Sequence, residues 1–229
     1  MSWLNEKEAF TNFIIENNII GFFEKPIKLK SGRSSYWYVN WRNISENVFL
    51  LDKLTDYIIS FVKSLGLKPD CFYGVPEGAT KLGLITQYKW AKKQLNYGKK
   101  MYSLAMGRGM PKEHGDPKDK FYLGFPKGKV IILEDTLTTG GSLIESIDKL
   151  LNLKVNVIGA IGLTNRNEMR DDGKSVEDAI KEKGVQFYAM SNAIELLPII
   201  YQKIKPGIEI AKIIEDYFRK YGISKLNLV

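Results

Sequence analysis

The sequence predicts an α/β fold, in which helices flank a central, mostly parallel sheet and a small hood lies at the N-terminus. Short apolar runs alternate along the chain with segments whose apolar residues recur at helical spacing. The runs lack the polar alternation of a half-exposed strand, which indicates strands buried on both faces. Strands separated mostly by helices predict a parallel sheet. We expect strands near residues 71–75, 101–105, 130–134, 155–163 and 185–190.

Three parts are expected along the chain: a hood over residues 1–45, an α/β core over 46–190 and C-terminal helices over 191–229. The hood begins with an amphipathic helix over about residues 5–18, which is predicted to end near Gly21. Two short strands around a Ser-Gly turn follow within residues 27–40. Further helices are predicted over 49–65, from about 80 to 92, and over 143–151, 176–183, 193–201 and 207–221. The last two are expected to pack on the core or the hood.

The composition is that of a soluble globular protein, with 44% hydrophobic and 26% charged residues. No apolar run approaches the length needed to span a membrane, and the first residues do not resemble a signal peptide. The single cysteine, Cys71, lies in an apolar stretch and is expected in the core. We therefore expect a cytoplasmic protein. The formal net charge of +8 fits either nucleic acid or a polyphosphate ligand, and the lysines are spread along the chain.

The most informative stretch begins with the apolar run Val130 to Leu133 and continues with two adjacent carboxylates, Glu134 and Asp135. A small, hydroxyl-rich loop then runs into the next predicted helix. Ligands of open parallel sheets bind beyond the carboxyl ends of the strands, and exposed N–H groups at a helix start favour an anion. The stretch therefore predicts a phosphate site beside two carboxylates. The alternative is an ordinary strand–turn–helix connection.

This stretch resembles the phosphoribosyl-diphosphate (PRPP) signature of the type I phosphoribosyltransferases. The resemblance implies that Glu134 and Asp135 face the ribose hydroxyls of PRPP and that Asp135 takes part in catalysis. It also implies a magnesium ion on PRPP, near these two carboxylates. The following loop would bind the 5′-phosphate through Thr136, Thr138, Thr139, Gly140, Gly141 and Ser142.

Two further segments resemble the orotate phosphoribosyltransferases within this family. Lys30-Ser-Gly-Arg33 is followed by an aromatic cluster that includes Tyr38, and Arg166 follows the strand at 155–163. The resemblance implies that Lys30, Tyr38 and Arg166 bind orotate. An aromatic face suits a flat base, and the planar fork of an arginine suits a carboxylate. The alternatives are a surface hairpin for the first segment, and a surface cap or a salt bridge to Glu168 for Arg166.

The remaining motifs concern the diphosphate. Gly74, Glu77 and Gly78 stand in the loop that binds pyrophosphate in the family. Residues 107–128 are expected to form a mobile loop, and its Arg108, Lys112 and His114 resemble the catalytic loop that closes over the neighbouring subunit. The implied assembly is a homodimer with shared active sites. The chain departs from the family pattern at Gly78 and Gly109, where lysines are common, and at Asn165, where an acid is common.

The resemblance implies a glycosyltransferase, more narrowly a pentosyltransferase, that converts orotate and PRPP to orotidine 5′-monophosphate and pyrophosphate in de novo pyrimidine synthesis. Two alternatives stay open. One is a phosphoribosyltransferase for another purine or pyrimidine base. The other is a PRPP-sensing regulator that binds nucleic acid without catalysis. The presence of Arg108, Lys112 and His114 favours catalysis over this last alternative.

Overall fold

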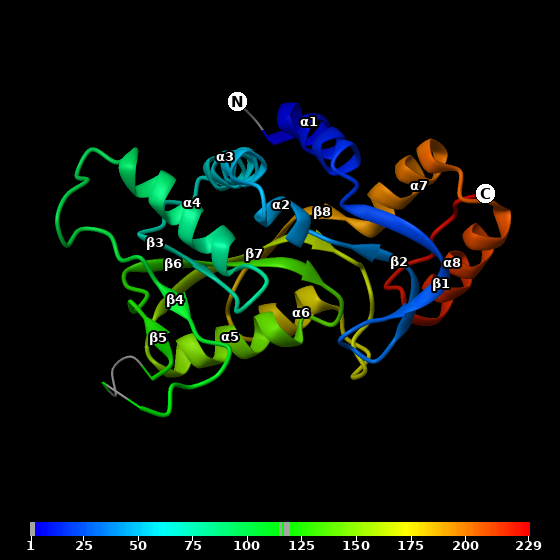
Figure 1. Cartoon of the computed structure of the whole chain (residues 1–229). Helices are drawn as coiled ribbons and strands as arrows, with labels where there is room; N and C mark the ends of the chain where they lie inside the picture. The colour runs from blue at the N-terminus through cyan, green and yellow to red at the C-terminus, as the bar shows by residue number, and fades with distance from the viewer. Residues whose placement is uncertain (1–2, 115, 117–119) are drawn as a thin grey trace.

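A four-stranded parallel sheet forms the centre of the computed structural model, which describes residues 3–114, 116 and 120–229 (Figure 1). Its order is β3-β6-β7-β8, and every neighbouring pair is parallel. The four strands are β3 Cys71–Gly74, β6 Lys129–Leu137, β7 Asn156–Asn165 and β8 Phe187–Asn192. The predicted fold class is therefore confirmed.

The sheet is buried on both faces, because neighbouring residues of β6 enter two different hydrophobic cores. Ile131 and Leu133 pack into a large core with helices α1, α3, α4, α7 and α8. Val130 and Ile132 pack on the opposite face with α5 and α6. The helices span α1 Trp3–Glu16, α3 Val48–Ser64, α4 Thr80–Lys92, α5 Gly141–Asn152, α6 Val176–Lys181, α7 Ala193–Ile204 and α8 Ile208–Tyr221.

An antiparallel hairpin follows α1 and lies at one end of the molecule beside α7 and α8 (Figure 1). Its strands are β1 Ile20–Lys28 and β2 Ser34–Val39, and a short helix, α2 Arg42–Ser45, follows them. The first strand begins earlier than predicted, and Gly21 lies within it. The helix before it already ends at Glu16, because Asn18 adopts a positive φ of 50° that no helix can continue.

The predicted strand over 101–105 is wrong. A strand there would have to pair with the free edge of β3, but the buried amide of Gln87 occupies that edge. Its oxygen accepts a hydrogen bond from the Phe72 N–H at 3.0 Å. Its nitrogen donates to the carbonyls of Asp70 and Ser103, at 3.0 Å and 2.8 Å. The segment is therefore bridged to β3 by a side chain instead of a backbone ladder.

The predicted loop over 107–128 contains part of a short antiparallel hairpin, β4 Met106–Gly107 with β5 Tyr122–Leu123. Gly115 and residues 117–119 of this loop lie outside the described residues. The mobility of the loop stays a prediction. Among the helices of the described ranges, none has the length and apolar character needed to cross a membrane.

Candidate active site

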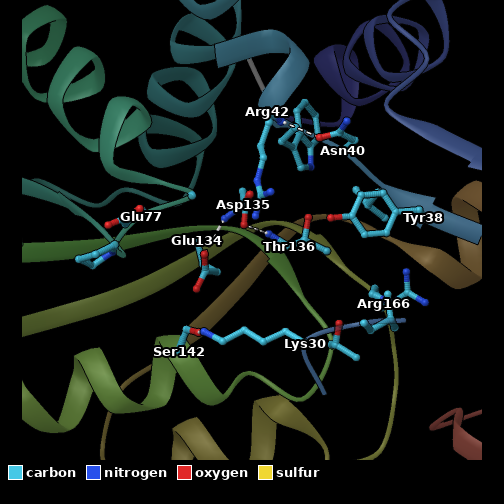
Figure 2. Close-up of a pocket in the computed structure, with 16 residues that line it drawn as sticks. Lys30, Tyr38, Asn40, Arg42, Glu77, Glu134, Asp135, Thr136, Ser142 and Arg166 are labelled. Atoms are coloured by element: carbon cyan, nitrogen blue, oxygen red, sulfur yellow. Dashed lines mark hydrogen bonds between the residues drawn. The ribbon is translucent and has the colours of Figure 1, made fainter. Parts of the chain in front are cut away.

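One pocket lies where the carboxyl ends of β6 and β7 meet the hood hairpin (Figure 2). Its volume is about 200 Å³. Ten of the predicted site residues line it: Lys30, Tyr38, Glu77, Gly78, Glu134, Asp135, Thr136, Thr138, Ser142 and Arg166. These residues come from five separate segments of the chain, and the fold brings them together at one edge of the sheet.

The two adjacent carboxylates differ in their surroundings. Glu134 is 7% exposed, and its pKa is raised well above the ordinary value, because burial and then the neighbouring charge of Asp135 disfavour ionisation. The ammonium group of Lys30 acts in the opposite direction. Asp135 is less buried, and its Oδ1 accepts a hydrogen bond from the Thr136 N–H at 2.7 Å. The pocket thus offers one solvated carboxylate and one that a bound cation would help to ionise.

These carboxylates fit a magnesium ion that arrives with its substrate. Within the described part of the chain, no cluster of three or more histidine, cysteine or acidic side chains could hold a metal ion by itself. Magnesium commonly uses one or two carboxylates, keeps several waters and binds substrate phosphates. Glu134 and Asp135 would supply the carboxylates of such a site.

The conformation of the hydroxyl-rich loop after β6 is fixed by a glycine and by a side-chain hydrogen bond. Gly140 has φ of 69° and is the N-cap of α5, and a Cβ there would lie 2.6 Å from Val176 Cγ1. Arg170 donates from its NH1 to the carbonyl of Thr139 at 2.6 Å. The hydroxyl oxygen of Thr136 is buried without a hydrogen-bond partner among the described residues, so it is available to a ligand.

Not every residue of this loop lines the pocket. Thr136, Thr138 and Ser142 line it, whereas Thr139, Gly140 and Gly141 are absent from its lining and shape the loop. An added Cβ at Gly141 would meet no atom within 4 Å. The backbone there is therefore open to close approach by a phosphate.

The loop after β3 forms the wall opposite the hood. A Cβ at Gly74 would lie 1.9 Å from the Ala79 carbonyl oxygen, so the tight turn into α4 requires glycine. The Pro76–Glu77 peptide bond is cis. A Cβ at Gly78 would lie 2.9 Å from Asp135 Oδ2, so the loop backbone lies directly against that carboxylate. Gly74 itself does not line the pocket.

The three residues predicted to bind the base all line the pocket. Lys30 extends from the hairpin turn and donates from Nζ to Ser142 Oγ at 2.9 Å, as Figure 2 shows. Tyr38 presents its ring from β2. Arg166 is 1% exposed, and its Nε lies 2.7 Å from Glu168 Oε1. The salt bridge considered as an alternative is therefore present, yet Arg166 also lines the pocket.

The three residues predicted to form a catalytic loop do not line the pocket of the two carboxylates. Arg108 lines a neighbouring pocket, which shares Lys30, Glu77 and Ser142 with the first. Lys112 and His114 line a hollow within their own loop. The backbone N–H of Lys112 is bonded to the Lys120 carbonyl at 2.9 Å, which extends the hairpin beyond β4 and β5.

The sequence reasoning assigned no role to Arg42 or Asn40, although both line the pocket. In Figure 2, Arg42 points from α2 toward Asp135. Trp41, which lies between Asn40 and Arg42 in the sequence, is buried. Its Nε1 donates a hydrogen bond to Thr164 Oγ1 at 3.1 Å, which connects the hood to β7. The position of both residues directly after the aromatic cluster was the signal that could have identified them.

Comparisons with known proteins show which proteins the chain is similar to. No protein-family model matches the chain. The orotate phosphoribosyltransferase of Methylococcus capsulatus is 26% identical over 223 residues, which cover 95% of this chain and 98% of that enzyme.

Two solved structures are similar in fold. The orotate phosphoribosyltransferase of Francisella tularensis has a TM-score of 0.66 at 22% identity, covering 93% of this chain and 99% of that one. The UMP synthase of Leishmania donovani has a TM-score of 0.69 at 19% identity, covering 94% of this chain and 42% of that one. The resemblance inferred from the motifs is thus confirmed: the chain has the type I phosphoribosyltransferase fold and is similar along nearly its whole length to orotate phosphoribosyltransferases.

Proposed function

We propose that this protein is an orotate phosphoribosyltransferase of pyrimidine synthesis, which converts orotate and PRPP to orotidine 5′-monophosphate and pyrophosphate. One observation carries the proposal. A single pocket combines an acidic pair, a hydroxyl-rich loop at a helix start and a buried arginine beside an aromatic ring. The first two features suit a phosphorylated sugar, and the last two suit a flat, anionic base.

PRPP would bind along β6 and its loop. Glu134 and Asp135 would accept hydrogen bonds from the ribose hydroxyls. The 5′-phosphate would lie in the loop from Thr136 to Ser142, where backbone N–H groups and the α5 dipole favour an anion. The diphosphate would face the loop formed by Gly74, Glu77 and Gly78. Arg42 would supply a cation on this side, where the family pattern has a lysine in place of Gly78.

Orotate would bind at the hood end. The guanidinium of Arg166 would meet the carboxylate of the base, and the ring of Tyr38 would pack near the pyrimidine. Lys30 would reach the ligand from the hairpin turn. Because its Nζ is bonded to Ser142 of the proposed phosphate loop, Lys30 would lie between the base and the 5′-phosphate.

The reaction forms a bond from the orotate ring nitrogen to C1′ and breaks the bond from C1′ to the diphosphate oxygen, which keeps the electron pair. The ring nitrogen releases its proton to water. Positive charge develops at C1′ in the transition state. The residues of this chain act by holding the sugar and base in line and by placing carboxylates near the developing charge. Magnesium, when bound with PRPP, supplies charge neutralisation on the diphosphate.

The remaining cations would come from a second subunit. Lys112 and His114 line a hollow formed by their own loop. They do not line the pocket that contains Asp135. We infer a homodimer in which the loop of each subunit brings Arg108, Lys112 and His114 over the partner's pocket. Arginine and lysine would neutralise the departing diphosphate, and the histidine would donate a hydrogen bond to it. A cytoplasmic location is part of the same proposal.

The decisive experiment is an acceptor panel. Purified protein, PRPP and magnesium are mixed in turn with orotate, uracil, adenine, guanine, hypoxanthine or xanthine, and pyrophosphate release is followed. Turnover with orotate alone is expected. Turnover with a different base would contradict the base assignment and leave the PRPP site standing. Binding of PRPP without turnover of any base would favour a regulator.

Mixing two inactive variants tests the shared sites. Asp135→Asn removes a pocket carboxylate, and Lys112→Ala removes a loop cation, so each homodimer should be nearly inactive. If the loop acts in trans, an equal mixture should recover about a quarter of wild-type activity, because half the dimers are hybrids with one intact site. No recovery after confirmed subunit exchange would contradict action in trans.

A further inference from the structure

A carboxylate outside the pocket, Glu168, is buried completely and receives three hydrogen bonds. Its Oε1 accepts from Arg166 Nε at 2.7 Å. Its Oε2 accepts from Arg33 NH1 at 3.0 Å and from the hydroxyl of Tyr217 at 2.8 Å. The side chains of Glu168 and Arg166 are 0% and 1% exposed. One carboxylate therefore joins the arginine of the base site to an arginine of the hood and a tyrosine of α8.

The cluster carries more positive than negative charge in its buried part. Two guanidinium groups share the single buried carboxylate. A second acid, Asp171, lies 2.8 Å from Arg33 NH2, but its side chain is 88% exposed and its charge is screened by water. Burial of an excess charge is costly unless a partner arrives. Because Arg166 lines the pocket, a ligand carboxylate there would complete the charge balance.

The guanidinium of Arg166 is also fixed in orientation. Its NH2 donates to Ser35 Oγ at 3.0 Å, and its NH1 lies 3.4 Å from the Trp37 carbonyl oxygen. Its Cζ lies 3.7 Å from the centroid of the Trp37 ring. These contacts, with the one to Glu168, engage Nε, NH1 and NH2 and fix the plane of the guanidinium.

The C-terminal helix supports the cluster from the side away from the pocket. Phe218 stacks on Trp37 with ring centroids 6.0 Å apart. The backbone N–H of Met169 donates to the Tyr221 carbonyl at 2.6 Å, so the segment that bears Glu168 is paired with the end of α8. Burial, and then the nearby charge of Glu168, raise the pKa of Tyr217, so its hydroxyl stays protonated and donates.

We propose that Glu168 and Tyr217 are positioning residues that hold the Arg166 guanidinium toward the pocket for the carboxylate of the base. The inference rests on the proposed function, since it concerns how that site selects an anionic base. It gives the C-terminal helix, for which the sequence suggested only packing on the core or the hood, a part in substrate specificity.

Tyr217→Phe is the variant that tests the inference, because it removes one hydroxyl and keeps the ring. Glu168→Ala would leave the buried Arg166 without a carboxylate partner and Arg33 with only the exposed Asp171, and it is expected to unfold the chain. Tyr221→Phe is the matched control. Tyr221 lies one turn further along α8, and its ring contacts Arg33. Among the described residues, the hydroxyl that bonds to Glu168 is that of Tyr217 and not that of Tyr221.

The assay compares two nucleotides by calorimetric titration: orotidine 5′-monophosphate, and uridine 5′-monophosphate, which lacks the carboxylate. For Tyr217→Phe, the Kd of the first should rise about tenfold, which is about 1.4 kcal/mol, because Glu168 loses a hydrogen bond that helps to hold Arg166 in place. The Kd of the second should change by less than about twofold, because it does not use the carboxylate contact. Tyr221→Phe should leave both constants unchanged.

The outcomes separate this inference from the proposed function. A wild-type protein that shows no preference for orotidine 5′-monophosphate over uridine 5′-monophosphate would overturn the orotate assignment and this inference together. A preference that persists in Tyr217→Phe would overturn the positioning role alone. Equal weakening of both nucleotides would show general loss of structure, and that result also contradicts a specific role for Tyr217.

Discussion

Replacing Gly140 with alanine should destabilise the loop that we assign to the 5′-phosphate of PRPP. Gly140 is the N-cap of α5 and has φ of 69°, in the left-handed region. An alanine Cβ would also lie 2.6 Å from Val176 Cγ1, well inside contact distance, and Val176 is only 2% exposed. Gly140→Ala therefore combines backbone strain with a steric clash in the core.

The two contributions can be estimated separately. A left-handed conformation costs a non-glycine residue about 1–2 kcal/mol. Overpacking a well-packed core costs about 1–3 kcal/mol. Together they predict a loss of about 2–5 kcal/mol in the free energy of unfolding. A central loss of about 3 kcal/mol corresponds to a fall in Tm of roughly 6–12 °C for a protein of this size.

Urea denaturation of the variants checks the estimate. Gly141→Ala is the matched control for stability, because its φ is not positive and its Cβ would meet no atom within 4 Å. It should be neutral or slightly stabilising, since alanine favours a helix. The double variant Gly140→Ala/Val176→Ala should lose less stability than the sum of the single variants, because removing the valine methyl groups relieves the clash.

A Gly140→Ala protein as stable as Gly141→Ala would refute the reasoning, because neither strain nor clash would then be present. Strict additivity in the double variant would refute the steric part alone. A rise in the PRPP KM of Gly140→Ala, measured where the protein is fully folded, is expected in addition, because the loop backbone would be displaced.

Three further predictions concern the pocket and the sheet edge. The Tm of Glu134→Gln minus the Tm of the wild type should increase as the pH rises from about 4 to about 8. The raised pKa of Glu134 means that the folded wild type is stabilised by protonated Glu134 and loses this stability when Glu134 ionises. A Tm difference that does not depend on pH would contradict this. Arg42→Ala should raise the PRPP KM about tenfold with little effect on the orotate KM, as expected for a cation on the diphosphate; an unchanged PRPP KM would remove Arg42 from that role. Gln87→Leu should lower the free energy of unfolding, measured by urea denaturation, by about 2–4 kcal/mol. The reason is that the buried N–H of Phe72 and the carbonyls of Asp70 and Ser103 lose their hydrogen-bond partner. A loss under about 1 kcal/mol would argue that water replaces the amide.

The parallel core could be predicted from the sequence because its signals are local. Each apolar run is continuous, as from Val130 to Leu133, and each helix shows a 3.6-residue period. The carboxylates and hydroxyls of the loop after β6 are adjacent in the sequence and directly follow an apolar run. Their position beyond the end of a strand could therefore be predicted. The structure confirmed the fold class and the strands at 71–75 and 130–134.

The expected strand at 101–105 failed because strand pairing is not a local property. Whether that segment pairs with β3 depends on Gln87, which lies on a helix and inserts its amide between the two. No periodicity within residues 101–105 could reveal this competitor. The separation of Lys112 and His114 from the carboxylates was equally hidden, because it depends on the path of a hairpin in space.

The sequence alone therefore determined the parallel core and indicated which short motifs suit a phosphate and a base, because both depend on neighbouring residues. Only the tertiary structure decided how Arg166, the residue we propose for the base, is held. Arg33, Arg166 and Tyr217 are far apart in the chain, yet all three donate a hydrogen bond to Glu168. The physical reason is that a buried charge must find its partners in three dimensions, and the packing of the hood and α8 on the sheet supplies them.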